Sequence, residues 1–188
     1  MSNDVDFPAA AATDKRDVIL AAATEAFARY GYRRTAMEDV ADLAGVSRPL
    51  LYTRFRNKAD LFAAVAQRLV DTALRDAETA WPPGAPVEDG LRAAALAKGL
   101  PLFRLLRDSP HGAELIAQAK DAAAGIQHDI TARFADLIAA RLAGHPDART
   151  LAAMAAHAIN GMKAGADSEA QFEREVRAFA RAFAAITR

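Results

Sequence analysis

The sequence contains no cysteine among its 188 residues. A disulfide framework, a cysteine metal site and a thiol nucleophile are therefore excluded, and the fold must rest on its core. Because 52% of the residues are hydrophobic, a core of sufficient size is available without cross-links. The lack of cysteine suits a reducing compartment, and we expect a cytoplasmic protein.

Long apolar runs are also missing. Charged residues interrupt every alanine-rich stretch well before the roughly 18 to 20 residues that a membrane span requires. The opening stretch, MSNDVDFPAAAA, is acidic and has no hydrophobic run of signal-peptide length. We expect residues 1–13 to form a disordered arm of a soluble chain that has no membrane partner.

Neither sign of charge is in excess, because 24 Lys and Arg residues balance 24 Asp and Glu residues. The strongly basic composition of many nucleic-acid-binding proteins is therefore absent, and any such site must be local. Aromatic residues make up only 7% of the chain, whereas alanine is abundant. This composition favours an all-α fold.

Motifs of catalysis and metal binding are not found. The four histidines have no tight ligand spacing, and the sequence has no Gly-rich phosphate loop, no G-x-S-x-G, no His-Glu-x-x-His and no Glu-x-x-His pair. We therefore expect no catalytic residue, no metal, no cofactor and no enzymatic activity. A helical-bundle catalyst remains the alternative with the least support.

Turn signals divide the first part of the chain into short helical blocks. Apolar residues recur at helical spacing over 14–30, and Gly31 follows at a C-terminal cap position. Thr35 and Glu38 have the spacing of a capping box that would begin a short second helix. Gly45 interrupts that helix, and Ser47 can cap a third one over 47–55. A longer helix follows Asn57 and ends before Trp81-Pro82-Pro83-Gly84.

Beyond this proline-glycine stretch, helical patterning continues to the C-terminus. The predicted helices span 87–98, 100–107, 113–142, 148–163 and 169–186, so that the chain has eight or nine helices. The stretch 113–142 contains Gly125 and can be one kinked helix or two. Both alternatives stay open at this point.

The second and third short helices, with a turn containing Gly45 between them, have the arrangement of a helix-turn-helix. If Leu51 and Phe55 face inward, helical spacing places Arg48, Pro49, Tyr52 and Thr53 on the opposite side. From residue 48 to residue 58 the chain has four basic residues and no acidic one. This neutral chain therefore has a local basic face that suits DNA.

The stretch from Ile19 to Phe62 resembles the N-terminal signature of the TetR family of regulators. The pattern reads F-x3-GY-x2-T-x3-DVA-x2-AGVS-x3-LY-x2-F-x2-K-x2-L and begins at Phe27. It fixes many positions over about forty residues, which makes it far more specific than the A-G-V-S turn alone. The resemblance implies a DNA-binding domain over 14–59 and a ligand-binding and dimerisation domain over 60–188.

The resemblance also implies roles for individual residues. Thr35, Ser47, Tyr52 and Lys58 would contact phosphates. Arg48, Thr53 and Leu50 would reach base edges. Pro49 and Arg54 depart from the family, which often has Gly and His there, so that the operator cannot be inferred from a relative. The full set expected at the DNA is Arg34, Thr35, Ser47, Arg48, Pro49, Leu50, Tyr52, Thr53, Arg54 and Lys58.

For the C-terminal domain the resemblance implies an effector pocket and a dimer interface made by the last two helices. Polar or aromatic residues of otherwise apolar helices are the candidates for ligand contact: Phe103, His111, Gln118, Gln127, His128 and Phe134. Apolar stripes supply the candidates for the interface: Leu151, Met154, Ala155, Ala158, Met162, Phe172, Val176, Phe179 and Phe183.

These expectations combine into a functional hypothesis. A homodimer would bind a palindromic operator on double-stranded DNA as a repressor and would be released by a small-molecule effector. The rival hypothesis is a helical interaction module that kept the helix-turn-helix but lost affinity for DNA, and the zero net charge is the observation in its favour.

Overall fold

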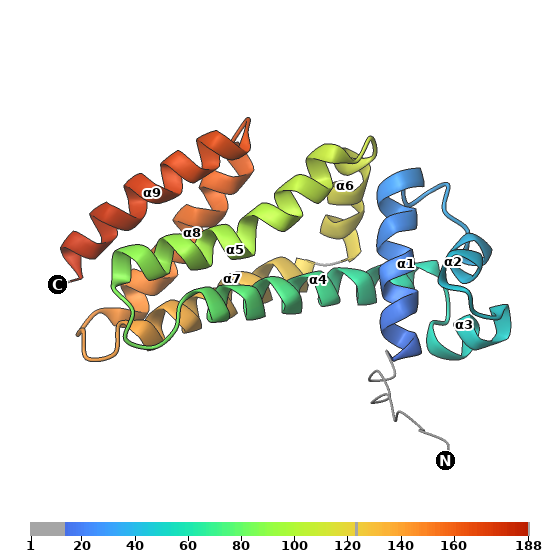
Figure 1. Cartoon of the computed structure of the whole chain (residues 1–188), viewed down its shortest axis with the longest axis horizontal. Coiled ribbons are helices and arrows are strands. Elements are labelled where there is room, and N and C mark those ends of the chain that lie inside the picture. Colours follow the sequence, from blue (N-terminus) through green and yellow to red (C-terminus); the bar gives the residue numbers. More distant parts are fainter. Residues whose placement is uncertain (1–13, 123, 188) are drawn as a thin grey trace, which may run out of the picture.

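The computed structural model describes residues 14–122 and 124–187, with the side chains of 119–129 left outside the description. Within these residues the chain forms nine α-helices and no strand, as predicted (Figure 1). The helices are α1 (Lys15–Tyr30), α2 (Met37–Ala44), α3 (Arg48–Arg54), α4 (Lys58–Ala80), α5 (Val87–Asp108), α6 (Gly112–Ala122), α7 (Ala124–Arg141), α8 (Ala148–Gly165) and α9 (Glu169–Ile186).

The start of α2 corrects the predicted capping box. The N-cap is Ala36, and the carboxylate of Asp39 accepts a hydrogen bond from its backbone N–H at 2.8 Å. Thr35 does not cap this helix, because its side chain turns into the core and donates to the carbonyl of Gly31 at 2.7 Å. The box was therefore predicted one residue too early.

The α5 helix corrects the predicted break at Gly99-Leu100-Pro101. The helix runs without interruption from Val87 to Asp108 with Pro101 inside it. A proline in a helix interior costs about 3 kcal/mol, but α5 packs against α4 and α9, and this packing holds it. Gly99 allows the close approach of α9, because a Cβ atom there would lie 2.7 Å from the ring of Phe172.

The stretch over 113–142, for which two alternatives were open, contains α6 and α7, one on each side of residue 123. Both helices pack on α4, and α7 also packs along α8. No described helix is long and apolar enough to cross a membrane. Among the side chains that the structure describes, no group of His, Asp and Glu residues could hold a metal ion.

The N-terminal helices share one hydrophobic core, which we call the head core. It comprises buried residues of α1, α2 and α3, the first turns of α4, and Leu115 of α6. Phe27, Tyr32 and Phe62 form an aromatic cluster in it, with ring centroids 5.1 to 5.8 Å apart. The head core therefore extends beyond residue 59, where the sequence placed the boundary, to at least Val65.

The second core lies between α4, α5, α7, α8 and α9, and we call it the C-terminal core. Trp81 lies fully buried at the end of this core that is far from the head. The backbone carbonyl of Trp81 accepts a hydrogen bond from Arg141 Nε at 2.9 Å. Gly90 makes room for this indole, since a Cβ atom there would clash with the Trp81 ring. Because α4 contributes to both cores, the two ends of the molecule share one continuous helix (Figure 1).

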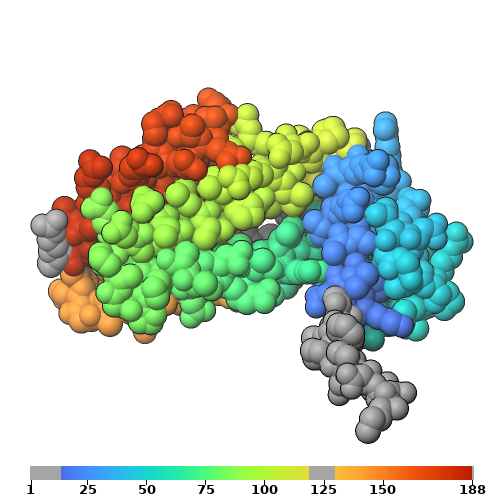
Figure 2. Space-filling view, in the orientation of Figure 1, coloured from blue at the N-terminus to red at the C-terminus, as the bar shows by residue number. Residues whose placement is uncertain are grey.

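A second connection joins the two ends through the start of α6. Ser109 Oγ donates to the carbonyl of Ala28 at 2.6 Å, and Glu114 Oε1 accepts from the backbone N–H of Arg33 at 2.8 Å. Gly31 packs directly against this turn, since a Cβ atom there would lie 2.6 Å from Glu114 Oε2. In Figure 2 the end of α5 and the helix α1 meet at this place without a visible gap.

Candidate nucleic-acid interface

The α3 helix presents a polar face to solvent at one end of the molecule (Figure 1). Leu51 and the following Phe55 are buried in the head core, as predicted. Ser47 caps the helix by accepting from the N–H of Leu50. Ser47, Arg48, Pro49, Tyr52, Thr53 and Arg54 are exposed, and Leu50 is half-buried.

Local hydrogen bonds and a proline in the first turn fix the exposed face of α3. The Thr53 hydroxyl donates to the carbonyl of Leu50 at 2.7 Å, and Tyr52 is 47% exposed. Pro49 lies in the first turn, where a backbone N–H has no helical partner and is not missed. Side chains at the start of such a helix reach base edges when the helix enters a major groove.

The basic stretch from 48 to 58 divides into two parts. Arg48 and Arg54 extend into solvent. Arg56 turns back to Asp60, whose carboxylate accepts from the Arg56 backbone N–H at 3.0 Å and from its guanidinium at 3.5 Å. These two hydrogen bonds, the backbone one first, lower the pKa of Asp60 below its usual value. The positive potential of the face therefore comes chiefly from Arg48 and Arg54.

Lys58 has a structural role that the sequence did not indicate. Its ammonium donates to the carbonyls of Thr35 and Arg33 at 2.9 and 3.1 Å, and it lies 4.8 Å from the centre of the Tyr32 ring. The side chain thus joins the start of α4 to the loop before α2. A phosphate contact would have to share an ammonium that already has these partners.

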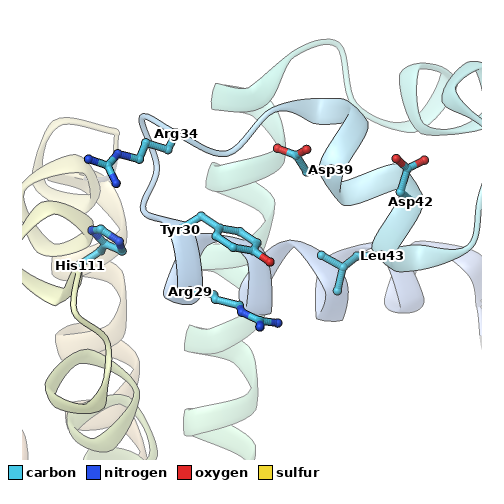
Figure 3. A pocket seen from close by; sticks show the side chains of 7 residues that line it. All are labelled: Arg29, Tyr30, Arg34, Asp39, Asp42, Leu43 and His111. Carbon is cyan, nitrogen blue, oxygen red and sulfur yellow. The ribbon is translucent and has the colours of Figure 1, made fainter.

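Two further residues expected at the DNA differ in exposure, because Thr35 is buried and Arg34 is exposed. Thr35 is 1% exposed, and its hydroxyl also approaches the carbonyl of Ala26 at 3.3 Å. Its expected contact with phosphate is contradicted by this burial. Arg34 is exposed beside it and lines a surface hollow between α1, α2 and the turn before α6 (Figure 3).

That hollow is lined by charges of both signs. Arg29 and Arg34 contribute positive charge, and Asp39 and Asp42 of α2 contribute negative charge. In Figure 3 the two carboxylates lie along α2, with Tyr30 between them and Arg34. The hollow therefore has no net preference for an anion, in contrast to the acid-free surface of α3. Its full lining is Arg29, Tyr30, Arg34, Asp39, Asp42, Leu43 and His111.

The candidates for ligand contact are spread over three places. Phe103 and Phe134 are buried in the C-terminal core. His111 lies at the turn before α6, with Nδ1 3.8 Å from Glu114 Oε2, and therefore borders the head. Gln118 is half-buried on α6. The side chains of Gln127 and His128 lie outside the described residues.

A polar cluster in the C-terminal core was missed by the sequence analysis. Lys98 of α5 is 2% exposed and donates to Asn160 Oδ1, and the Asn160 Nδ2 group in turn donates to Thr131 Oγ1 at 2.8 Å. A signal was present, because Lys98 continues the apolar stripe of Leu91 and Ala94 at helical spacing. A charged residue at a position that helical spacing places on the buried side is unusual, and it can be recognised from the sequence.

The residues expected at the dimer interface divide between the inside and the outside of the chain. Ala155, Phe172, Val176 and Phe183 are buried in the C-terminal core, because α5 packs against α9 and α7 against α8. They are core residues of this chain, which corrects their assignment. Leu151, Ala158, Met162 and Phe179 are half-buried, and Met154 is 62% exposed.

Comparisons with known proteins agree with this architecture. Residues 19–65 match the family described as bacterial regulatory proteins, tetR family. The chain is 36% identical over 84 residues to an uncharacterized HTH-type transcriptional regulator, YhgD, of Bacillus subtilis, covering 45% of this chain and 44% of the relative. It is 36% identical over 103 residues to the HTH-type transcriptional activator FasR of Mycolicibacterium smegmatis, covering 55% and 45%. The alignments thus span less than half the length of these relatives.

Solved structures extend the likeness to the whole fold. A transcriptional regulator from Rhodococcus sp. Rha1 superimposes with a TM-score of 0.69 at 22% identity, covering 91% of this chain and 96% of that one. The TetR family repressor AlkX from a Dietzia strain superimposes with a TM-score of 0.65 at 19% identity, covering 92% and 95%. The family match in the head and the shared fold of the remainder lead to one conclusion: residues 19–65 form a domain of the tetR family of bacterial regulatory proteins, within a chain that has the fold of solved transcriptional regulators.

Proposed function

We propose that this protein is a sequence-specific repressor that binds operator DNA as a homodimer and releases it when a small molecule binds in the C-terminal domain. The acid-free, exposed face of α3 is the observation that carries the proposal. Arg48 and Thr53 would read base edges, whereas Ser47, Tyr52 and Arg54 would hold phosphates. Arg34, Pro49 and Leu50 would border the groove.

The connection between the two cores supports control by a ligand. Ser109, in the turn before α6, bonds to the end of α1, and Glu114 of α6 bonds to the loop after α1. In addition, α4 belongs to both cores. A ligand that changes the packing of α5, α6 or α7 would therefore move the head. Among structural neighbours, one is titled a SmeT–triclosan complex, so a protein of this fold holds a small molecule.

The direction of regulation is proposed as repression. AlkX is described as a repressor implicated in biodegradation of n-alkanes, whereas FasR is described as an activator. Repression requires only that a bound dimer blocks access to the promoter. Activation would need a further surface for contact with the transcription machinery, and nothing among the described residues singles out such a surface.

The proposed DNA contacts are tested by binding to duplexes from the protein's own promoter region. Fluorescence anisotropy over a range of salt concentrations should show tighter binding to this DNA than to random duplex. Replacement of Arg48 by alanine should lower specific affinity about tenfold to a hundredfold, and R149A, on exposed α8, serves as the control. Equal affinity of the unchanged protein for both duplexes would overturn the proposal, and the absence of binding to either would in addition favour the interaction-module hypothesis.

Dimerisation is proposed through the outer surfaces of α8 and α9, at the end of the molecule opposite the head (Figure 1). Met154 would be its centre, with Leu151, Ala158, Met162 and Phe179 beside it. A twofold there would place two α3 helices in successive major grooves, about 34 Å apart.

Analytical ultracentrifugation tests this interface. M154E should shift the protein from dimer to monomer, because it places a carboxylate in an apolar contact. T79E on exposed α4 should leave the dimer unchanged. A monomeric unchanged protein, or a dimer that survives M154E, would contradict the proposed interface without bearing on the fold of the head.

A further inference from the structure

The C-terminal core contains an ammonium group with too few partners. Lys98 Nζ donates to Asn160 Oδ1 at 2.9 Å and lies 4.6 Å from the centre of the Phe134 ring. An ammonium has three N–H donors, and Lys98 is 2% exposed, so that water does not serve the others at the surface. A buried cation is costly unless it is paired.

A second lysine increases this imbalance. Lys163 follows Asn160 by one turn of α8, and its Cδ lies 3.7 Å from the position that a Cβ atom on Gly99 would occupy. Burial lowers the pKa of Lys163. Burial, and then the positive charge of Lys163, lower the pKa of Lys98 from 10.5 to about 7. Among the described side chains, no carboxylate forms an ion pair with either lysine.

The partners of Lys98 form a network that crosses three helices. Lys98 belongs to α5, Asn160 to α8 and Thr131 to α7, and the hydrogen bonds join them in that order. A neutral structural amine is the plain alternative, and its single hydrogen bond to Asn160 would satisfy it. The plain alternative does not account for Lys163, whose positive charge acts on Lys98 and which has no carboxylate partner among the described side chains.

The surroundings are aromatic and apolar. The ring of Phe134 lies against the ammonium of Lys98, and the ring of Phe172 borders Gly99. Phe103 stacks on Phe172, with ring centroids 6.3 Å apart. Such surfaces suit the hydrocarbon part of a ligand, and a few placed polar groups fix its orientation.

We propose that the junction of α5, α7 and α8 binds a small organic carboxylate, whose anionic group pairs with Lys98 and Lys163 while its apolar body packs against Phe134, Phe103 and Phe172. This inference rests on the proposed effector function and names the chemical class of the effector. The carboxylate supplies the negative charge that the core lacks, and Asn160 orients Lys98 toward it.

Binding of a carboxylate has a distinctive signature at this site. Lys98 is largely neutral at pH 8, because its pKa is about 7. An anion stabilises the charged form, so that binding takes up a proton from the buffer. A neutral ligand of the same size would bind without proton uptake.

Isothermal titration calorimetry on the full chain without DNA tests the proposal with octanoate and phenylacetate as probes. The matched neutral probes are 1-octanol and 2-phenylethanol, and inorganic phosphate tests whether any anion suffices. We expect at least one carboxylate to bind tenfold or more tightly than its alcohol, with proton uptake seen as different heats in Tris and HEPES buffers. Equal binding of carboxylate and alcohol, or phosphate binding as tightly as the carboxylates, would overturn the proposal.

Variants locate the site. K98M should lower carboxylate affinity about tenfold to a hundredfold and abolish proton uptake, and K163M should lower affinity with proton uptake retained. K15M, on exposed α1, is the matched control. Unchanged carboxylate affinity in both K98M and K163M would place the ligand elsewhere and overturn the assignment. If K98M does not fold, K163M and the proton uptake of the unchanged protein still decide.

A final measurement separates this inference from the proposed function. Promoter DNA is titrated with the protein in the presence and absence of the carboxylate that binds. Calorimetric binding without any DNA affinity would support the site and contradict the repressor. DNA binding without a carboxylate preference in calorimetry would support the regulator and contradict the site.

Discussion

Each of the two cores of this protein contains a lysine, and the two lysines differ in their position and in their hydrogen-bond partners. In the head, Lys58 remains at the edge of the core, where two backbone carbonyls and the Tyr32 ring receive its ammonium. In the C-terminal core, Lys98 lies inside and has one amide oxygen and one ring. The lysine of the head is therefore fully partnered without a ligand, whereas the lysine of the C-terminal core has donors left for one.

This difference corresponds to two kinds of recognition. In the proposed function the head recognises DNA with the exposed side of a short helix, whose inner side is fixed by the buried Leu51 and Phe55. The C-terminal domain keeps its polar groups inward, on helices that contribute apolar residues around them. An outward face can be read by a rigid macromolecule, whereas an inward cluster is reached only by a small molecule.

The largest expected effect comes from removing the aromatic centre of the head. Phe27 packs edge-on against Phe62, with ring centroids 5.3 Å apart, and is 2% exposed. F27A should destabilise the head by about 3–5 kcal/mol and abolish DNA binding. Chemical denaturation and DNA anisotropy measure both effects, and Y30A, on the exposed side of the same helix, is the control. A variant that still binds DNA with full affinity would show that α3 does not depend on this cluster.

The next effect concerns pH and belongs to the C-terminal core. The pKa of Lys98 is about 7 when folded, against an ordinary value of 10.5. Between these two values the unfolded chain binds the additional proton, so stability rises with pH. From pH 7 to pH 9 the free energy of unfolding should gain about 2 kcal/mol from this group.

Urea denaturation at several pH values measures this gain. K98M should be more stable than the unchanged protein at pH 7 and should lack this part of the pH dependence, while K15M should keep it. If the unchanged protein and K98M had parallel pH profiles, Lys98 would not carry a lowered pKa, and the contrast between the two cores would disappear.

The smallest expected effect distinguishes a structural hydroxyl from a DNA contact. Thr35 donates to Gly31 from within the head core, so T35V should cost about 1–2 kcal/mol. At temperatures where the variant is folded, its affinity for DNA should be unchanged. S47A, at an exposed cap, provides the comparison, since Ser47 is placed for a phosphate. A lower DNA affinity of folded T35V would restore the contact expected from the sequence.

The sequence predicts the head well because its signals are local. Gly31 and Gly45 adopt positive φ angles at the ends of α1 and α2, where only a residue without a side chain is unstrained, and Ser47 caps α3 as expected. What the sequence could not supply is the direction of particular side chains. Thr35 and Lys58 turn inward because backbone carbonyls at the end of α1 and in the following loop accept hydrogen bonds from them.

The C-terminal core was predicted less completely because its determinants are distant along the chain. Pro101 indicates a helix end, yet contacts with α4 and α9 hold α5 through it. Phe172 and Phe183 form apolar stripes that suit either a partner or the protomer's own core, and only the tertiary arrangement decides. Lys98 and Asn160 are 62 residues apart, so no local pattern joins them.

The position of the single tryptophan gives the molecule a built-in optical probe. Trp81 is fully buried at the far end of the C-terminal core, and its indole N–H has no hydrogen-bond partner among the described residues. The three tyrosines, Tyr30, Tyr32 and Tyr52, all lie in the head. Fluorescence excited at the red edge therefore reports on one end of the molecule, while tyrosine signals report on the other. The two ends of the molecule can thus be followed separately in an unlabelled protein when the proposed ligand response is tested.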